Sequence, residues 1–290
     1  IRLLTDSQLY VIIPTREESF VKRYERPAPF DYRNIPRSET ASVICLIEDQ
    51  ELSPHETFVL FIYNIADKDQ PPNEELEWLR SSKLDRRYGK PSGGGLPTGG
   101  VEDQYLENPG GAAIRETEAE TGLELERVDH LFTDDGIIIS DKRTGAKIRR
   151  ISYTKGRQKS ITTFSRTQKA LDNSIHVFSG KVKNWPRSNL KKFFLAEKNH
   201  LIGTNQTTAE EIADTGIYAM SLSDDDYDLL GIEERKEICG IALISVSALA
   251  HMFNTNNFRF AKDFFVYPSH VIRTIRGLIQ IGILKEVGAN

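Results

Sequence analysis

A glycine-rich turn followed by an acidic helix is the feature of this 290-residue sequence that most restricts how the chain folds. Residues 93–100 contain five glycines, and residues 93–95 at their start are expected to form a flexible loop. Asn108 and Pro109 follow, and they are favoured residues for an N-cap and for the first helical position. These signals predict a helix with its body at residues 112–121, ended by Gly122.

Two glutamates on this predicted helix form a candidate binding site for a divalent metal ion. Glu116 and Glu120 are four residues apart, so their side chains lie one turn apart on the same helix face. The two carboxylates repel each other, and a hard cation between them offsets that repulsion. Mg²⁺ takes a small number of carboxylates together with water and phosphate oxygens. Gly99 and Gly100 leave room for a backbone carbonyl or a phosphate to come close.

Residues 99–123 resemble the box of the Nudix hydrolase family, read as G-x5-E-x7-R-E-U-x-E-E-x-G-U with U an aliphatic residue. The matching positions are Gly99 or Gly100 at the start, then Glu107, Arg115, Glu116, Glu120, Gly122 and Leu123. The resemblance implies that Glu116 and Glu120 bind Mg²⁺ or Mn²⁺ and serve catalysis, with a carbonyl of the glycine loop completing the metal shell. It also implies that Arg115 and Glu107 form an ion pair that orients this loop against the helix.

The sequence departs from the family box at three places. The segment between the glycine and Glu107 is one residue longer counted from Gly100, or two residues longer counted from Gly99. Thr117 replaces an aliphatic residue, and Ala119 stands where the first glutamate of the Glu-Glu pair belongs. Because Ala119 removes one ligand, a second or third metal ion is expected to bind more weakly or not at all.

The resemblance implies a divalent-metal-dependent hydrolase, a Nudix-type pyrophosphohydrolase that cleaves a diphosphate bond in a nucleoside-diphosphate-linked substrate. Such a reaction needs a carboxylate as its general base. The sequence leaves the identity of this base open among Glu120, Glu210, Glu211, Glu233, Glu234 and Glu237. The alternative is a non-catalytic nucleotide sensor or binding module of the same fold, which the alanine at position 119 and the longer loop favour.

Runs of β-branched and aromatic residues predict strands both before and after the helix. The predicted strands are residues 9–13, 42–47, 57–63, 128–132, 136–140, 148–153, 160–164, 175–182 and 237–245. Further helices are predicted at residues 74–84 and 247–253, and an amphipathic helix at residues 269–286 with Ser269 as its cap. Strands without regular βαβ alternation indicate an α+β fold with a mixed sheet. The resemblance implies a Nudix-type α/β/α sandwich.

The chain is predicted to consist of an N-terminal arm (residues 1–37), a Nudix-like domain (38–253) and a C-terminal helical extension (254–290). A basic insertion near residues 141–170 carries ten Lys and Arg residues, with no acidic residue in 142–169. We expect a solvated hairpin there, and contact with substrate phosphates or an anionic partner is the alternative. The tail helix is expected to pack on its own domain, and the alternative is an interchain contact in a homodimer.

The overall charge is close to balanced, with 38 Lys and Arg residues against 42 Asp and Glu residues. This balance argues against a strongly basic nucleic-acid binder. No apolar run reaches the roughly 20 residues that a membrane span needs, so no membrane partner is expected. The resemblance implies a small-molecule partner, a nucleoside-diphosphate derivative. Cys45 and Cys239 are the only cysteines, and both lie in apolar predicted strands. They indicate buried thiols in a reducing, cytoplasmic compartment.

Overall fold

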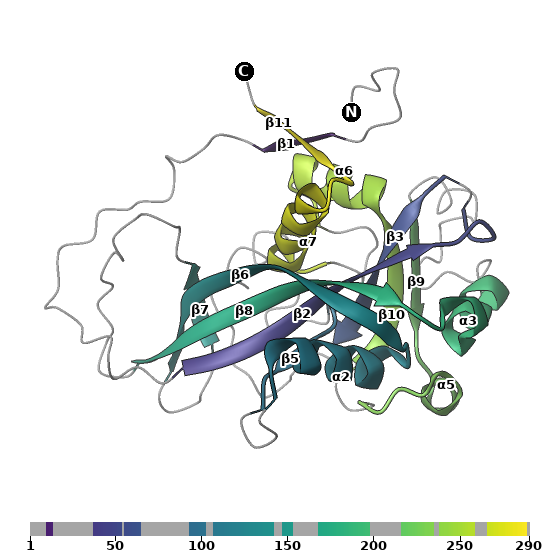
Figure 1. Cartoon of the computed structure of the whole chain (residues 1–290), viewed down its shortest axis with the longest axis horizontal. Coiled ribbons are helices and arrows are strands. Elements are labelled where there is room, and N and C mark those ends of the chain that lie inside the picture. The colour runs from purple at the N-terminus through teal and green to yellow at the C-terminus, as the bar shows by residue number, and fades with distance from the viewer. Residues whose placement is uncertain are drawn as a thin grey trace, which may run out of the picture.

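The computed structural model describes residues 10–13, 37–53, 55–64, 93–102, 107–141, 147–152, 168–197, 216–234, 238–258 and 266–288. Its centre is a nine-stranded sheet in the order β7-β6-β8-β2-β3-β10-β9, with β4 added beside β3 and β5 beside β2 (Figure 1). The strands are β2 (Arg37–Glu48), β3 (Thr57–Asn64), β4 (Gly93–Gly95), β5 (Thr98–Gly100), β6 (Leu125–Asp141), β7 (Lys147–Ser152), β8 (Gln168–Val182), β9 (Ile217–Ser221) and β10 (Ile238–Ser245). These neighbours pair antiparallel except β2 and β8, which are parallel, so the sheet is mixed.

Two apolar cores lie on the two faces of this sheet. The predicted hairpin is confirmed, because β2 pairs antiparallel with β3 and places Leu46 opposite Val59. Successive side chains of a strand point to opposite faces. Val43 therefore belongs to one core and Ile44 to the other.

Helices cover both faces of the sheet and bury these cores (Figure 1). One layer contains α2 (Pro109–Thr121), α3 (Asn189–Glu197) and α5 (Asp224–Leu230), and the other contains α6 (Val246–Thr255) and α7 (Pro268–Gln280). The expected α+β class with a mixed sheet between helices is therefore confirmed. None of the helices in the described ranges is both long and apolar enough to cross a membrane.

The start of α3 is tied to the sheet by a buried polar contact. Trp185, in a short 3-10 helix (Trp185–Arg187), donates from its indole Nε1 to Oδ2 of Asp49 at 2.8 Å. Lys191 places its Nζ 2.8 Å from the same oxygen. Asp49 is 8% exposed, so these two donors satisfy a carboxylate that has little access to water.

Helix α2 begins and ends where the sequence predicts. The side chain of Asn108 accepts a hydrogen bond from the backbone N–H of Gly111 at 2.9 Å, as an N-cap does. Gly122 has φ 66° and its N–H donates to the carbonyl of Glu118 at 2.8 Å. A Cβ at Gly122 would lie 1.8 Å from the carbonyl oxygen of Leu230, so the end of α2 packs directly on the end of α5.

The strand predicted in the N-terminal arm is also confirmed. β1 (Tyr10–Ile13) pairs parallel with β11 (Lys285–Gly288) in a separate two-stranded sheet. The two labelled strands lie on the side of the molecule that carries α6 and α7 (Figure 1).

The tail helix packs on its own sheet but is shorter than predicted. Pro268 occupies its first turn, so the cap is Tyr267 and the prediction of Ser269 as cap is wrong. The helix ends at Gln280 rather than at residue 286, because Gly282 takes φ 81° and turns the chain toward β11. A Cβ at Gly277 would lie 2.3 Å from Cδ1 of Ile44, so α7 approaches the sheet at a glycine.

Several other elements differ from the sequence predictions. Predicted strands 128–132 and 136–140 are parts of one long strand, β6, and the expected flexible loop at residues 93–95 is the buried strand β4. The strand β9 and the helices α3 and α5 were not predicted. The predicted helix at 74–84 and strand at 160–164 lie outside the described residues.

Candidate metal site

The two glutamates of the box turn inward from α2 toward β5. Glu116 is 7% exposed and Glu120 is 4% exposed, so neither belongs to a solvated helix face. A Cβ at Gly99 would lie 1.8 Å from Cδ of Glu116, which means that only a glycine fits opposite this carboxylate. The backbone N–H of Thr98 donates to Oε2 of Glu120 at 3.0 Å. The glycine-rich strand thus fixes both carboxylates against the sheet.

Arg115 links the helix to the segment that precedes it. Its Nε and Nη2 donate to the two carboxylate oxygens of Glu107, both at 3.0 Å, in a bidentate ion pair. Its Nη1 lies 2.6 Å from Oε1 of Glu116, and its Nη2 also donates to the carbonyl of Gly100 at 3.0 Å. These hydrogen bonds from Arg115 lower the pKa of Glu107 and raise the pKa of Arg115 itself. The sequence-predicted pair is therefore formed, and it joins the glycine strand to the helix.

A third carboxylate reaches the two box glutamates from another part of the chain. One ligand oxygen from each of Glu116, Glu120 and Glu234 lies within 4.8 Å of the other two. Glu234 follows α5, in a loop where the N–H of Glu233 donates to the carbonyl of Ala119 at 2.9 Å. This contact pins the loop to the last turn of α2 and brings Glu234 to the site.

Sequence reasoning included Glu234 only among several candidates for the base, without a reason to prefer it. Glu233 is described, and it lines the outer side of α2 rather than the glutamate cluster. The candidates Glu210, Glu211 and Glu237 lie outside the described residues. The only sequence signal was the acidic stretch that contains Glu234, because the docking of its loop depends on tertiary contacts.

The residues of this cluster fit a hard divalent cation. Three carboxylates within 4.8 Å of one another concentrate negative charge, and the guanidinium of Arg115 contacts one of them, Glu116. Carboxylate oxygens without imidazole or thiolate suit Mg²⁺ or Mn²⁺ among the common metals. Cys45 on β2 is fully buried, and this burial, together with the charge of Glu120, raises the pKa of its thiol to about 12. This thiol stays protonated, in keeping with its expected role as a buried apolar side chain.

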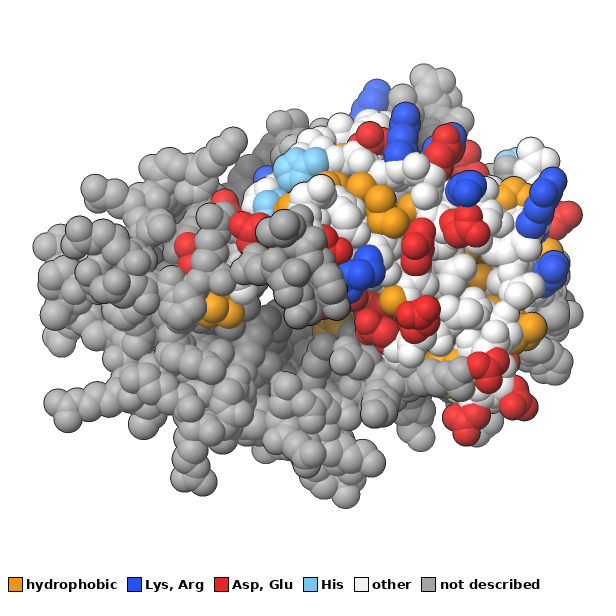
Figure 2. All heavy atoms as spheres, turned by 60° about the horizontal axis from the view of Figure 1, so that its bottom comes forward, with side chains coloured by type: hydrophobic (Ala, Val, Ile, Leu, Met, Phe, Trp, Pro, Cys, Tyr) orange, Lys and Arg blue, Asp and Glu red, His pale blue; other side chains and the backbone are white. Residues whose placement is uncertain are grey.

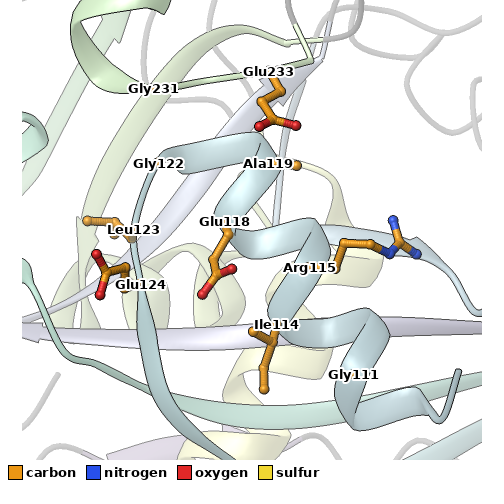
Figure 3. Close-up of a pocket in the computed structure, with 10 residues that line it drawn as sticks. All are labelled: Gly111, Ile114, Arg115, Glu118, Ala119, Gly122, Leu123, Glu124, Gly231 and Glu233. Carbon is orange, nitrogen blue, oxygen red and sulfur yellow. The ribbon is translucent and has the colours of Figure 1, made fainter.

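Ala119, the position where the box lacks a glutamate, lies on the outer side of α2. It borders a shallow hollow of about 570 Å³ whose wall also includes Arg115, Glu118 and Glu233 (Figure 3). Figure 3 shows Ala119 beside Glu233 and one turn beyond Arg115. The position where the box lacks a glutamate therefore lies at the rim of the site, whereas Glu116 and Glu120 lie on its buried side.

The sequence matches no family model and no curated protein. Among solved structures, the chain is similar in fold to Nudix proteins. One is the NUDIX domain of Shewanella oneidensis NrtR complexed with ADP ribose, with 10% identity, a TM-score of 0.26 and coverage of 52% of this chain. Another is a MutT/nudix family protein from Enterococcus faecalis, with 12% identity, a TM-score of 0.30 and coverage of 89% of this chain. The chain spans 65% of the length of each.

Proposed function

We propose that this protein is a divalent-metal-dependent hydrolase of the Nudix type that cleaves a diphosphate bond in a nucleoside-diphosphate-linked substrate. The observation that carries the proposal is the convergence of Glu116, Glu120 and Glu234 beside the glycine strand that ends at Gly100. A cluster of this kind beside the paired glycines Gly99 and Gly100 can hold a cation and admit phosphate oxygens. We expect Mg²⁺ or Mn²⁺, held by Glu116 and Glu120, with Glu234 as the base.

The chemistry can be divided among named residues. A divalent ion held by Glu116 and Glu120 would neutralise charge on the diphosphate and orient a water molecule. Water attacks phosphorus, the bond from phosphorus to the bridging oxygen breaks, and a carboxylate accepts the proton of the water. Oε2 of Glu120 already accepts a hydrogen bond from Thr98, so its orientation is fixed as a ligand requires. We assign the proton acceptor to Glu234, which comes from a separate loop. Arg115 and Glu107 position the glycine strand.

The proposal is tested by Glu120→Gln, with Glu118→Gln as a matched control on the exposed side of the same helix. The assay measures product release from nucleotide sugars, dinucleotides and nucleoside triphosphates with Mg²⁺ or Mn²⁺. Glu120→Gln should lower turnover by at least about 100-fold, because it removes a metal ligand, while the melting temperature changes little. Glu118→Gln should keep wild-type turnover. Full activity of Glu120→Gln would contradict the proposal.

A non-catalytic nucleotide sensor is the second candidate function. The observation that favours it is Ala119, together with the lengthened segment before Glu107. Ligand-induced thermal stabilisation across the same panel, without product release under any metal condition, would support this alternative.

The free cysteines Cys45 and Cys239 fit either function in a reducing compartment, and we propose the cytoplasm.

A further inference from the structure

A polar and aromatic strip continues across the sheet from the N-terminus of α2. Its residues come from three adjacent strands, β2, β6 and β8, on the same sheet face as α2. They are Glu39, His130, Thr133, Asp135, Ser174, His176 and Phe178. We call these residues the histidine strip. Figure 2 turns the α2 side of the molecule toward the viewer and shows histidine side chains at the surface close to acidic ones.

The register of the strands places the histidine strip beside the candidate metal site. A Cβ at Gly110, in the first turn of α2, would lie 3.9 Å from Cε1 of Phe178, so the strip begins where the helix begins. On β2, Ala41 pairs with Gly99, the glycine that contacts Glu116. Glu39 is two residues farther along β2, which is about 7 Å at the usual rise of a strand. A group attached to a diphosphate at the metal site can therefore reach Glu39.

Hydrogen bonds join the side chains of the histidine strip. Oγ1 of Thr133 lies 3.2 Å from Nε2 of His130 and 3.2 Å from Nδ1 of His176. A threonine hydroxyl has one proton to donate, so it donates to one imidazole and accepts from the other. Nε2 of His176 lies 3.6 Å from Oε2 of Glu39, within ion-pair range but beyond hydrogen-bond distance. The hydroxyl of Thr133 thus bridges the two imidazole rings.

The groups that remain at the surface are mostly acceptors. The side chain of Glu39 is 31% exposed and Asp135 is exposed, so two carboxylates present acceptor oxygens there. Burial lowers the pKa of His176, against the opposing effect of Glu39, so this imidazole is neutral at pH 7. His130 and Phe178 lie with ring centroids 5.3 Å apart and provide an aromatic surface. Such a surface repels a further phosphate and suits an uncharged ligand rich in hydroxyl donors.

We propose that the histidine strip binds a vicinal diol of the substrate, with Glu39 accepting hydrogen bonds from its two hydroxyls. This inference rests on the proposed function, because the metal site fixes where the diphosphate lies. The diol belongs either to the ribose of the nucleoside or to a second sugar linked through the diphosphate. In both cases the substrate is a nucleoside diphosphate whose sugar end extends along β2 from Gly99 toward Glu39. Glu39 and Thr133 are then residues that determine specificity.

Ligand binding measured by calorimetry in the presence of Ca²⁺, where the ligands are not turned over, tests this inference separately from the proposed function. The probes are ADP-ribose, ADP, 2′-deoxy-ADP and inorganic pyrophosphate, and the variants are Glu39→Gln and Thr133→Val. Glu126→Gln is the matched control, since Glu126 is an exposed carboxylate on β6 that pairs with Lys181. We expect Glu39→Gln to weaken ADP-ribose binding about tenfold, Thr133→Val to weaken it several-fold, and neither to change pyrophosphate binding. The control should match the wild type.

The probes also identify the source of the diol. If ADP and ADP-ribose are weakened equally by Glu39→Gln and 2′-deoxy-ADP is unaffected, the nucleoside ribose occupies the strip. If only ADP-ribose is weakened, the second sugar does. Equal dissociation constants for wild type and both variants, or no binding of either diol ligand to the wild type, would overturn the inference. Circular dichroism verifies folding, and Thr133→Val stands alone as the test if Glu39→Gln does not fold. If the wild-type protein binds these ligands but hydrolyses none of them, the proposed hydrolase function is contradicted instead.

Discussion

Replacing Gly99 by alanine tests how β5 holds the carboxylates of the candidate metal site. A Cβ at this position lies 1.8 Å from Cδ of Glu116 and 2.1 Å from its Oε1. Carbon atoms in contact are about 3.5 Å apart, so the carboxylate has to move by about 1.7 Å or the strand has to leave the helix. Gly100 is the matched control, because no atom lies within 4 Å of a Cβ there. Neither glycine has a positive φ, so the comparison isolates the contact.

The expected cost follows from the contacts that the shift disturbs. Overpacking costs about 1–3 kcal/mol, and the displaced carboxylate also strains its 2.6 Å contact with Arg115. We expect Gly99→Ala to lower the free energy of unfolding by about 2–3 kcal/mol, which is about 5–10 °C in melting temperature for a chain of this size. Gly100→Ala should change the free energy by less than about 0.5 kcal/mol. Mn²⁺ affinity should fall about 10–100-fold in Gly99→Ala, because a ligand is displaced.

The assay is thermal unfolding of both variants, followed by calorimetric titration of each with Mn²⁺. Wild-type protein and Gly100→Ala should melt together and should both be stabilised by the ion. If Gly99→Ala melts with them and binds Mn²⁺ equally well, Glu116 does not pack against β5 and the reasoning about the site is refuted.

Three further predictions concern individual contacts. Glu107→Gln should lower the free energy of unfolding by about 1 kcal/mol near pH 7. The reason is that hydrogen bonds from Arg115 lower the pKa of Glu107 on folding. That contribution is present above the ordinary pKa of glutamate and is lost as pH falls through the folded-state value, so denaturant melts of variant and wild type should converge in acid. Gly122→Ala should destabilise the protein more than Gly231→Ala. Both glycines have a positive φ, but only at Gly122 would a Cβ lie 1.8 Å from a backbone carbonyl oxygen. Equal urea midpoints for the two variants would refute this. Trp185→Phe should cost about 1–3 kcal/mol, since it removes a donor from the buried carboxylate of Asp49; an unchanged midpoint in guanidinium would count against it.

The helix at the centre of the site could be predicted because its signals are local. The cap at Asn108, the proline at 109 and the glycine at 122 act within one or two turns of the residues they organise. The spacing of Glu116 and Glu120 likewise follows from helical geometry alone. Four-residue spacing does not reveal burial, however. That both side chains turn against β5 depends on a tertiary contact, the close approach of Gly99 to Glu116.

The third carboxylate of the site could not be predicted, because its position depends on contacts between distant segments. Glu234 joins the cluster through the hydrogen bond between Glu233 and Ala119, and no sequence spacing encodes that contact. The end of α7 was misplaced for a related reason. Apolar spacing continues to Ile283, but Gly282 turns the chain, and Ile283 packs on the core from the turn rather than from a helix.

The parallel pairing of β2 with β8 has a consequence for how the chain reaches this structure. Arg37 pairs with Asp172, residues separated by 172 − 37 = 135 positions, so the middle of the sheet has a high contact order. Folding dominated by such pairings is slow, on the order of milliseconds to seconds. On the ribosome, β2 has to wait for synthesis of β8 while its edge remains open. A nascent chain halted before β8 is therefore expected to aggregate through β2 and to depend on chaperones until the later strand emerges.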